Sequence, residues 1–184
     1  MWNLRTGKEI KKLEGHTDGV VSVVWSPDSK HILTGSWDNT VCLWNLKTQT
    51  VKTFRGCTSE VTSIALQSDG KKAIIGCEDA KVRVWNLETD TIEAILEGHE
   101  KAVHAVALSK NGKQILTGSE DTTARLWDLE TVQMSVLHGH TNTVTSVAFS
   151  PDGTYALTGS CDSTARLWNL DYVQHKLELR ELLA

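Results

Sequence analysis

The sequence lacks most of the features that mark specialised classes of protein. Its densest apolar stretch, Val20–Trp25, is only as long as a strand, which leaves no transmembrane segment and no recognisable signal peptide in the 184 residues. The few cysteines have neither metal-site spacing nor the pattern of a disulfide framework. They are Cys42, Cys57, Cys77 and Cys161. We therefore expect an intracellular, cytoplasmic protein with reduced thiols.

An excess of positive charge is also missing. The 19 lysines and arginines are interleaved with 23 aspartates and glutamates, for a formal net charge of -4. Neutralising phosphates requires a basic face, so we expect no binding to nucleic acid, and we expect no membrane partner. The sequence shows no nucleophile with its base, no glycine-rich phosphate loop and no paired carboxylates. We predict that the protein is not an enzyme and uses no cofactor or metal.

What the sequence does contain is a repeat. The segment Gly139–Leu170 reads GHTNTVTSVAFSPDGTYALTGSCDSTARLWNL, and similar segments begin at Gly15, Gly56 and Gly98. The tryptophans that close the copies are separated by 41, 42 and 41 residues. They are Trp44, Trp85, Trp127 and Trp168. Self-similarity at such a period predicts a repeat architecture in which each copy is one structural unit.

Each copy has short alternating segments separated by turns rich in Asp, Asn and Gly. In the first copy these segments predict four strands. The strands are Val20–Trp25, His31–Ser36, Thr40–Asn45 and Val51–Arg55. The fourth strand has counterparts at Thr91–Glu97 and Gln133–His138. Strands spaced about ten residues apart predict an all-β array.

The repeated Gly-His, Ser-Pro-Asp-Gly, Leu-Thr-Gly-Ser-x-Asp and Trp-Asn or Trp-Asp resemble the WD-repeat (tryptophan-aspartate) β-propeller family over Met1–Leu170. The resemblance implies a propeller of four-stranded blades, with four blades in this chain. The expected blades cover about residues 15–55, 56–97, 98–138 and 139–170, with an outer strand at 8–14 and a C-terminal tail at 171–184.

In that family a His, a Thr or Ser, an Asp and the Trp form a hydrogen-bonded chain that fastens each blade. Carried over, this chain contains His16, Thr34, Asp38 and Trp44 in the first copy, His99, Thr117, Asp121 and Trp127 in the third, and His140, Thr158, Asp162 and Trp168 in the fourth. The second copy keeps Asp79 and Trp85 but has Cys57 and Ile75 at the other two places. We interpret this as an exchange of polar partners for small apolar side chains, so Cys57→His alone should not stabilise the protein.

Two chemical interpretations compete with structural ones. His138 and His140 could form a metal pair, but the resemblance gives His140 a structural role and His138 ends a strand. Cys57 and Cys77 could form a disulfide within one blade, whereas buried free thiols behave as small apolar side chains. We favour the structural interpretation in both cases.

Closure of the ring is the open question. Four blades alone need roughly 90° per blade, against about 45° to 50° in rings of seven or eight. We expect two chains to form an eight-bladed ring as a homodimer, with Lys8–Glu14 of each completing the partner's last blade beside Ala165–Trp168. The alternatives are a segment of a longer propeller, which the start at Met1 inside a repeat favours, and a strained four-bladed monomer. The tail can be an outer strand, from the alternation of Val173, His175, Leu177 and Leu179, or a short helix at 177–183.

The family resemblance implies a non-catalytic scaffold that binds proteins or peptides across its top face. Carried over, the top-face positions are Gly19, Val21, Trp37, Glu60, Thr62, Glu78, Ala102, His104, Glu120, Thr143, Thr145 and Cys161. These positions include three glutamates and no lysine or arginine, so we predict a docking face for a basic peptide, with Trp37 supplying stacking or cation–π contact. The alternatives are an ordinary solvated rim, a structural segment of a larger protein without binding of its own, and a channel-site enzyme or metal-binding propeller.

Overall fold

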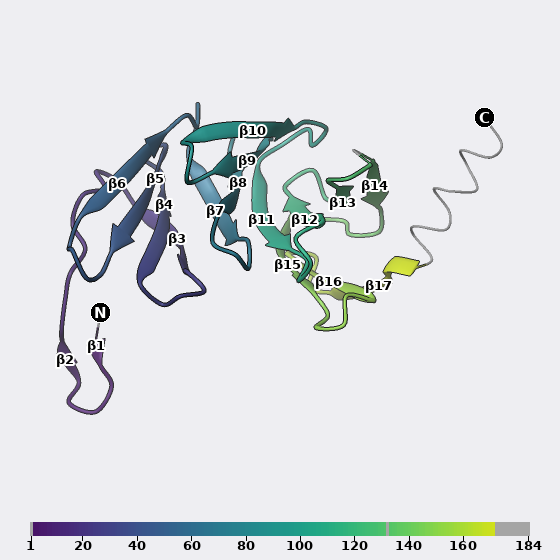
Figure 1. Cartoon of the computed structure of the whole chain (residues 1–184). Coiled ribbons are helices and arrows are strands. Elements are labelled where there is room, and N and C mark those ends of the chain that lie inside the picture. The colour runs from purple at the N-terminus through teal and green to yellow at the C-terminus, as the bar shows by residue number, and fades with distance from the viewer. Residues whose placement is uncertain (1, 132, 172–184) are drawn as a thin grey trace.

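The computed structural model describes residues 2–131 and 133–171. They form a small hairpin followed by four antiparallel sheets, which lie side by side along an open arc (Figure 1). Each inner strand contacts the inner strand of the next sheet, as β3 contacts β7, β7 contacts β11 and β11 contacts β15. No helix in the described part of the chain is long and apolar enough to span a membrane.

The first three sheets are complete four-stranded blades. The strands of the first are β3 (Val20–Trp25), β4 (His31–Ser36), β5 (Thr40–Asn45) and β6 (Val51–Arg55). Those of the second are β7 (Val61–Leu66), β8 (Lys72–Cys77), β9 (Val82–Asn86) and β10 (Thr91–Leu96). Those of the third are β11 (Val103–Leu108), β12 (Gln114–Ser119), β13 (Ala124–Asp128) and β14 (Met134–Leu137). The all-β prediction is confirmed, and the four strands predicted for the first copy have the observed bounds.

The fourth sheet has three strands within the described residues: β15 (Val144–Phe149), β16 (Tyr155–Ser160) and β17 (Ala165–Asn169). Within one copy Lys8–Glu14 does not complete this sheet, and its pairing with the last blade of a partner stays a prediction. Only β2 (Lys8–Glu9) is a strand, and it pairs with β1 (Trp2–Asn3). The local turn is stabilised by four hydrogen bonds to Asn3. Its side-chain oxygen accepts the Arg5 and Thr6 N–H groups, and its carbonyl accepts the Thr6 and Gly7 N–H groups.

The single chain is therefore an open arc, and it does not form the closed four-bladed monomer that was one of the alternatives. The strand or helix expected from Val173, His175, Leu177 and Leu179 lies outside the described residues, so the structure leaves that part of the prediction as it was.

Neighbouring blades pack through a glycine on the second strand of one and two apolar side chains on the inner strand of the next. A Cβ added at Gly35 would lie 2.5 Å from Val61 Cγ1 and 2.7 Å from Ile64 Cδ1. Gly76 meets Val103 and Val106 in the same way. A side chain at the glycine would fill the space that the next blade occupies, so these glycines allow the close approach of the sheets.

Each such seam carries its own apolar core. In the first seam Leu33, Val41 and Phe54 of one blade pack with Val61 and Ile64 of the next. A hydrogen bond of 2.9 Å from the Ile64 N–H to Ser22 Oγ crosses the same seam. The other two seams repeat the apolar arrangement. The core of the chain therefore lies between blades, and a blade at either end of the arc has only one of its faces covered.

Candidate functional site

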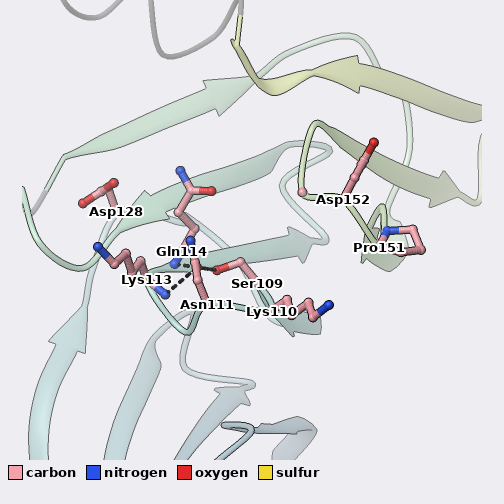
Figure 2. A pocket seen from close by; sticks show the side chains of 9 residues that line it. Ser109, Lys110, Asn111, Lys113, Gln114, Asp128, Pro151 and Asp152 are labelled. Carbon is pink, nitrogen blue, oxygen red and sulfur yellow. Dashed lines mark hydrogen bonds between the residues drawn. The ribbon is translucent and has the colours of Figure 1, made fainter.

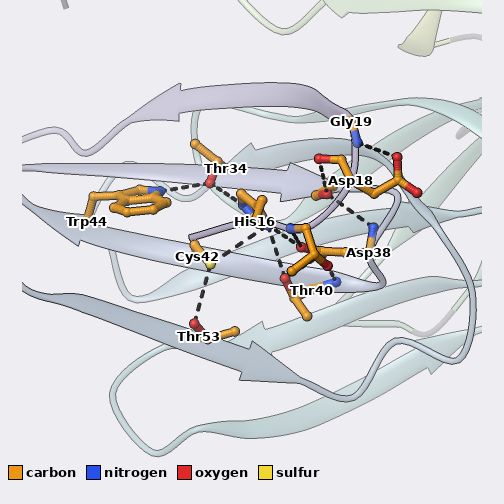
Figure 3. Close-up of polar contacts among 11 residues, drawn as sticks. His16, Asp18, Gly19, Thr34, Asp38, Thr40, Cys42, Trp44 and Thr53 are labelled. Atoms are coloured by element: carbon orange, nitrogen blue, oxygen red, sulfur yellow. Dashed lines mark hydrogen bonds and ion pairs between the residues drawn. The ribbon is translucent and has the colours of Figure 1, made fainter. Parts of the chain in front are cut away.

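The expected polar chain exists in the first blade (Figure 3). His16 Nδ1 lies 2.9 Å from Asp38 Oδ2, and His16 Nε2 lies 2.7 Å from Thr34 Oγ1. The Trp44 indole N–H donates to Thr34 Oγ1 at 2.8 Å. A neutral imidazole satisfies every member, because Nδ1–H donates to the carboxylate and the threonine hydroxyl donates to Nε2.

The third and fourth blades repeat this chain with nearly the same lengths. The His99 Nδ1 to Asp121 Oδ2 and His140 Nδ1 to Asp162 Oδ2 distances are both 2.7 Å. The corresponding Thr117 and Thr158 hydroxyls accept the Trp127 and Trp168 indole N–H groups at 3.0 Å. The structure thus brings together all twelve side chains that the resemblance placed in these three chains.

Burial and hydrogen bonding set the ionisation of these groups. Burial alone would raise the pKa of Asp38, but bonds from the Thr40 hydroxyl, the Thr17 amide and His16 outweigh it and lower the pKa from 3.8 to about 2. The pKa of Asp121 falls to about 2 against the same effect of burial. Burial lowers the pKa of His99 despite the opposing influence of Asp121. These hydrogen-bonded side chains therefore include ionised aspartates and, at His99, an imidazole held neutral.

A second threonine belongs to each of these chains, and the sequence interpretation missed it. The Thr40, Thr123 and Thr164 hydroxyls donate to the other oxygen of the turn aspartate at 2.5, 2.6 and 2.6 Å. The signal was available, since the first, third and fourth copies read Asp-x-Thr at this turn and the second reads Asp-Ala-Lys.

The second blade does not simply replace polar side chains with apolar ones. Arg83, which is almost fully buried, contacts Asp79 through both terminal nitrogens, and its Nη2 lies 2.6 Å from Asp79 Oδ2. Thr58 Oγ1 donates to the same carboxylate at 2.7 Å and accepts from Arg83 Nη2 at 2.9 Å. A charged network has taken the place of the histidine chain, and the sequence interpretation needs this correction.

Two buried polar atoms of the second blade, Arg83 Nε and Trp85 Nε1, are left without a hydrogen-bond partner. The Trp85 indole N–H is buried and makes no hydrogen bond, because Ile75 stands where the other blades have a threonine hydroxyl. The cysteines nearby are free thiols, as is each of the four in the chain. A hydrogen bond with Cys57 and burial both raise the pKa of the Cys77 thiol above its usual range.

The predicted top-face positions lie at one end of the strands, and in every blade a backbone bond joins two of them. The Trp37 N–H donates to the Gly19 carbonyl at 3.0 Å, and the Glu78 N–H donates to the Glu60 carbonyl at 3.0 Å. The equivalent bonds from Glu120 to Ala102 and from Cys161 to Thr143 are both 2.9 Å. The remaining positions, Val21, Thr62, His104 and Thr145, lie on the inner strands.

The side chains of this face differ in what they offer to a ligand. The Trp37 ring is 51% exposed and packs against Gly19, where an added Cβ would lie 2.8 Å from it. Glu60 and Glu78 are exposed. Glu120, by contrast, lies 3.3 Å from Lys101 Nζ, and Ala102 is buried. The acidic character that the sequence predicted for the whole face is therefore greatest in the second blade, beside the tryptophan of the first.

A hollow of about 650 Å³ lies at the opposite end of the strands, between the third and fourth blades (Figure 2). Lys110, Lys113, Asp128 and Asp152 line it together with uncharged turn residues, so its charges are balanced. Similar hollows occur where the corresponding turns of the earlier blades meet. The hollow is therefore a consequence of blade packing that recurs along the arc.

Nothing among the described residues gathers three or more metal-binding side chains. His140, one member of the suggested histidine pair, has both ring nitrogens engaged by Asp162 and Thr158. The structure does not bring the pair into a metal-binding group within that part of the chain.

Consecutive four-stranded sheets with their inner strands in contact define a β-propeller-like repeat protein. A model of the WD domain, G-beta repeat, matches residues 7–45, 48–86, 91–128 and 131–169. The chain therefore belongs to the WD-repeat family. Proteins of this family are generally non-catalytic scaffolds that bind proteins or peptides.

Individual relatives match over about one repeat. The chain is 56% identical over 36 residues to a ribosome biogenesis protein WDR12 homolog of Brugia malayi, a match covering 19% of this chain and 8% of that protein. It is 50% identical over 38 residues to the protein Notchless of Drosophila melanogaster, covering 21% and 8%. A guanine nucleotide-binding protein subunit beta of Saccharomyces cerevisiae is 42% identical over 45 residues, covering 24% and 11%. The matches thus span only a small part of the length of these relatives.

Proposed function

We propose that this chain is a non-catalytic scaffold that binds a protein or peptide segment on its top face. The observation that carries the proposal is the exposed Trp37 ring, which is held against Gly19 beside the exposed glutamates of the second blade. A rigid aromatic side chain, here in the turn after β4, gives contact area at little cost in side-chain entropy.

The ligand we infer is a basic peptide. A lysine or arginine side chain can lie over the Trp37 indole, while Glu60 and Glu78 supply opposite charge from the adjacent blade. Glu120 contributes less because Lys101 already neutralises it. The docking site is therefore centred on the first two blades, with the other top-face positions forming its margin. Nucleic acid and membranes are not expected as partners.

Calorimetric titration with an arginine-containing peptide and a matched acidic peptide tests this proposal. Trp37→Ala and the double variant Glu60→Gln with Glu78→Gln should each weaken binding of the basic peptide by about tenfold, or about 1.4 kcal/mol. The control is Glu88→Gln with Glu130→Gln, which removes two exposed glutamates from the turns before the outer strands of the second and third blades. Equal binding by the docking-site variants and the control variant would refute the proposal.

A second candidate is a structural segment of a larger protein with no binding of its own. The small share of each relative that the chain matches favours it. A chain that binds neither peptide measurably would support this candidate, whereas binding abolished by Trp37→Ala would argue against it. A channel-site enzyme is a weaker candidate, since no three metal-binding side chains come together in the described residues.

We further infer that the scaffold works as a homodimer in the cytoplasm, with two arcs completing an eight-bladed ring. Both end blades leave large apolar side chains exposed, and the four cysteines are free. A ring would present the docking site twice, which favours partners with two basic segments.

A further inference from the structure

The two ends of the arc carry the two halves of a seam that the chain already forms three times. In each internal seam the inner strand of one blade fills the space beside the second-strand glycine of the blade before it. Within residues 2–131 and 133–171, no blade packs against the free side of the first blade or of the fourth. The internal seams therefore serve as a template for what each end can bind.

At the first end, two side chains that should fill a seam face solvent. Val20 stands where the next three blades have Val61, Val103 and Val144, and each of these is fully buried. Val23 is 68% exposed, whereas its counterpart Ile64 is 7% exposed. We call Val20 and Val23 the leading pair.

At the other end, the space that receives such a pair is open. An added Cβ at Gly159 meets only its own blade's Ser146 Cβ, at 3.7 Å, whereas one at Gly118 meets Val144 Cγ1 at 2.7 Å. Leu167 is 66% exposed, although its counterpart Leu126 is buried. We call Leu157, Gly159 and Leu167 the trailing face.

The polar contacts of the seams are complementary as well. In the first two internal seams Ser22 Oγ and Ser63 Oγ accept a backbone N–H from the next blade, at 2.9 and 3.2 Å, while the third seam has Ala105 at this place. Ser146 is the equivalent residue of the fourth blade, and it is exposed. By the same register its hydroxyl would accept the Val23 N–H of an incoming first blade. The open ends thus match in hydrogen bonding and in shape.

The segment before the first blade completes the match. Leu13 stands two residues before the glycine that opens its repeat, as Phe54 does in the next copy. Phe54 is buried in a seam and pairs with Val41 on the third strand of its blade. The counterpart of Val41 in the fourth blade is Ala165, on β17, which has a neighbouring strand on one side only in the described chain.

We propose that the trailing face of one copy binds the leading pair of a second copy, and that residues 11–14 of that second copy add to β17 with Leu13 opposite Ala165. A two-fold axis then generates two identical seams between the copies. This inference deepens the homodimer proposed above, and it rests on the proposed scaffold for its consequence that each dimer carries two docking sites. Its occupant is a second copy of this chain, because both halves of the seam come from the same repeat.

Sedimentation velocity on the wild-type chain tests the assembly. We expect a species of twice the 20.3 kDa chain mass. Gly159→Val and Leu167→Glu should each give a folded monomer, because the first fills the open space and the second places a charge in the seam. Ile95→Glu is the control, since Ile95 is also an exposed apolar residue but lies on the outer strand of the second blade. A monomeric wild-type chain, or equal dissociation by the control, would overturn the proposal.

Cross-linking tests the strand addition separately. In a Cys161→Ser background, co-expressed Leu13→Cys and Ala165→Cys chains should form a disulfide-linked pair on mild oxidation. Leu13→Cys with Ile95→Cys should not, and equal linkage in both mixtures would overturn the register. Peptide binding is measured on the same samples. A monomer that still binds peptide refutes the seam and the homodimer but not the docking site, whereas a dimer without peptide binding refutes the docking site but not the seam.

Discussion

The incomplete polar chain of the second blade gives the sharpest prediction about stability. Cys57 and Ile75 occupy the places of His16 and Thr34, and the Trp85 indole N–H is buried without an acceptor. We expect Cys57→His and Ile75→Thr each to lower the free energy of unfolding or leave it unchanged. The double variant should be more stable than the sum of the two single effects. In the third blade His99 and Arg125 occupy the positions of Cys57 and Arg83. A histidine at position 57 is therefore sterically compatible with the neighbouring arginine.

Each single variant leaves the hydrogen-bonded chain of the second blade incomplete. Cys57→His places a ring nitrogen against the apolar Ile75 side chain, and leaving a buried polar atom unpaired costs about 1–3 kcal/mol. Ile75→Thr removes apolar volume worth roughly 1.5 kcal/mol. It also gives the Trp85 N–H an acceptor, so its net effect should lie near zero. The double variant adds the bond between hydroxyl and imidazole, which exists in neither single variant.

The assay is urea unfolding of the wild type, both single variants and the double variant, followed by tryptophan fluorescence. The interaction energy of the cycle should be about 1–3 kcal/mol in the stabilising direction. An interaction energy below about 0.5 kcal/mol would be ordinary additivity and would refute the reasoning. Stabilisation by Cys57→His alone would refute it as well, since the threonine partner would then be unnecessary.

Three further predictions concern the other features of the blades. The pKa values of Asp38 and Asp121 are lowered from 3.8 to about 2 on folding. Their contribution to the free energy of unfolding is therefore complete above pH 3.8 and is lost as the pH falls toward 2. A fluorescence-monitored acid titration should show this loss, and constant stability between these two pH values would contradict it. Arg83→Met should cost about 1.5–3 kcal/mol in urea unfolding, because it removes charged hydrogen bonds around a partly buried carboxylate; a cost below about 0.5 kcal/mol would show that the network is dispensable. Gly118→Ala should lower the melting temperature because its Cβ meets the next blade, whereas Gly159→Ala should leave the isolated monomer unchanged, and equal effects in calorimetry would contradict the open end.

The sequence alone was sufficient for the blades because their information is local and repeated. Alternating apolar residues between short turns determined the strands of the first copy to the residue. The resemblance to the WD-repeat family placed His16, Thr34 and Asp38 in one hydrogen-bonded chain, and the structure forms that chain.

The failures arose where a residue's partner depends on a contact that no repeat specifies. In the sequence Arg83 is one polar residue among others in a strand, and only the fold shows that it forms an ion pair with Asp79. The glutamates of the top face look alike in sequence, yet Lys101 reaches Glu120 alone among them in the described contacts. At the N-terminus Lys8–Glu9 pairs with Trp2–Asn3 around a short turn at Asn3, a local hairpin that no repeat specifies.

Each repeat has constant structural positions and one variable position, and this difference indicates where binding specificity must lie. The turn aspartate and its histidine face inward in the first, third and fourth blades with almost the same distances, so they cannot distinguish one ligand from another. The residue before that aspartate is held by the same backbone bond in all four blades, yet it is Trp37, Glu78, Glu120 or Cys161. A fixed backbone with a variable side chain is the arrangement that lets one fold serve many ligands. Substitution at Trp37 should therefore change binding with little effect on folding, whereas substitution at Asp38 should change folding first.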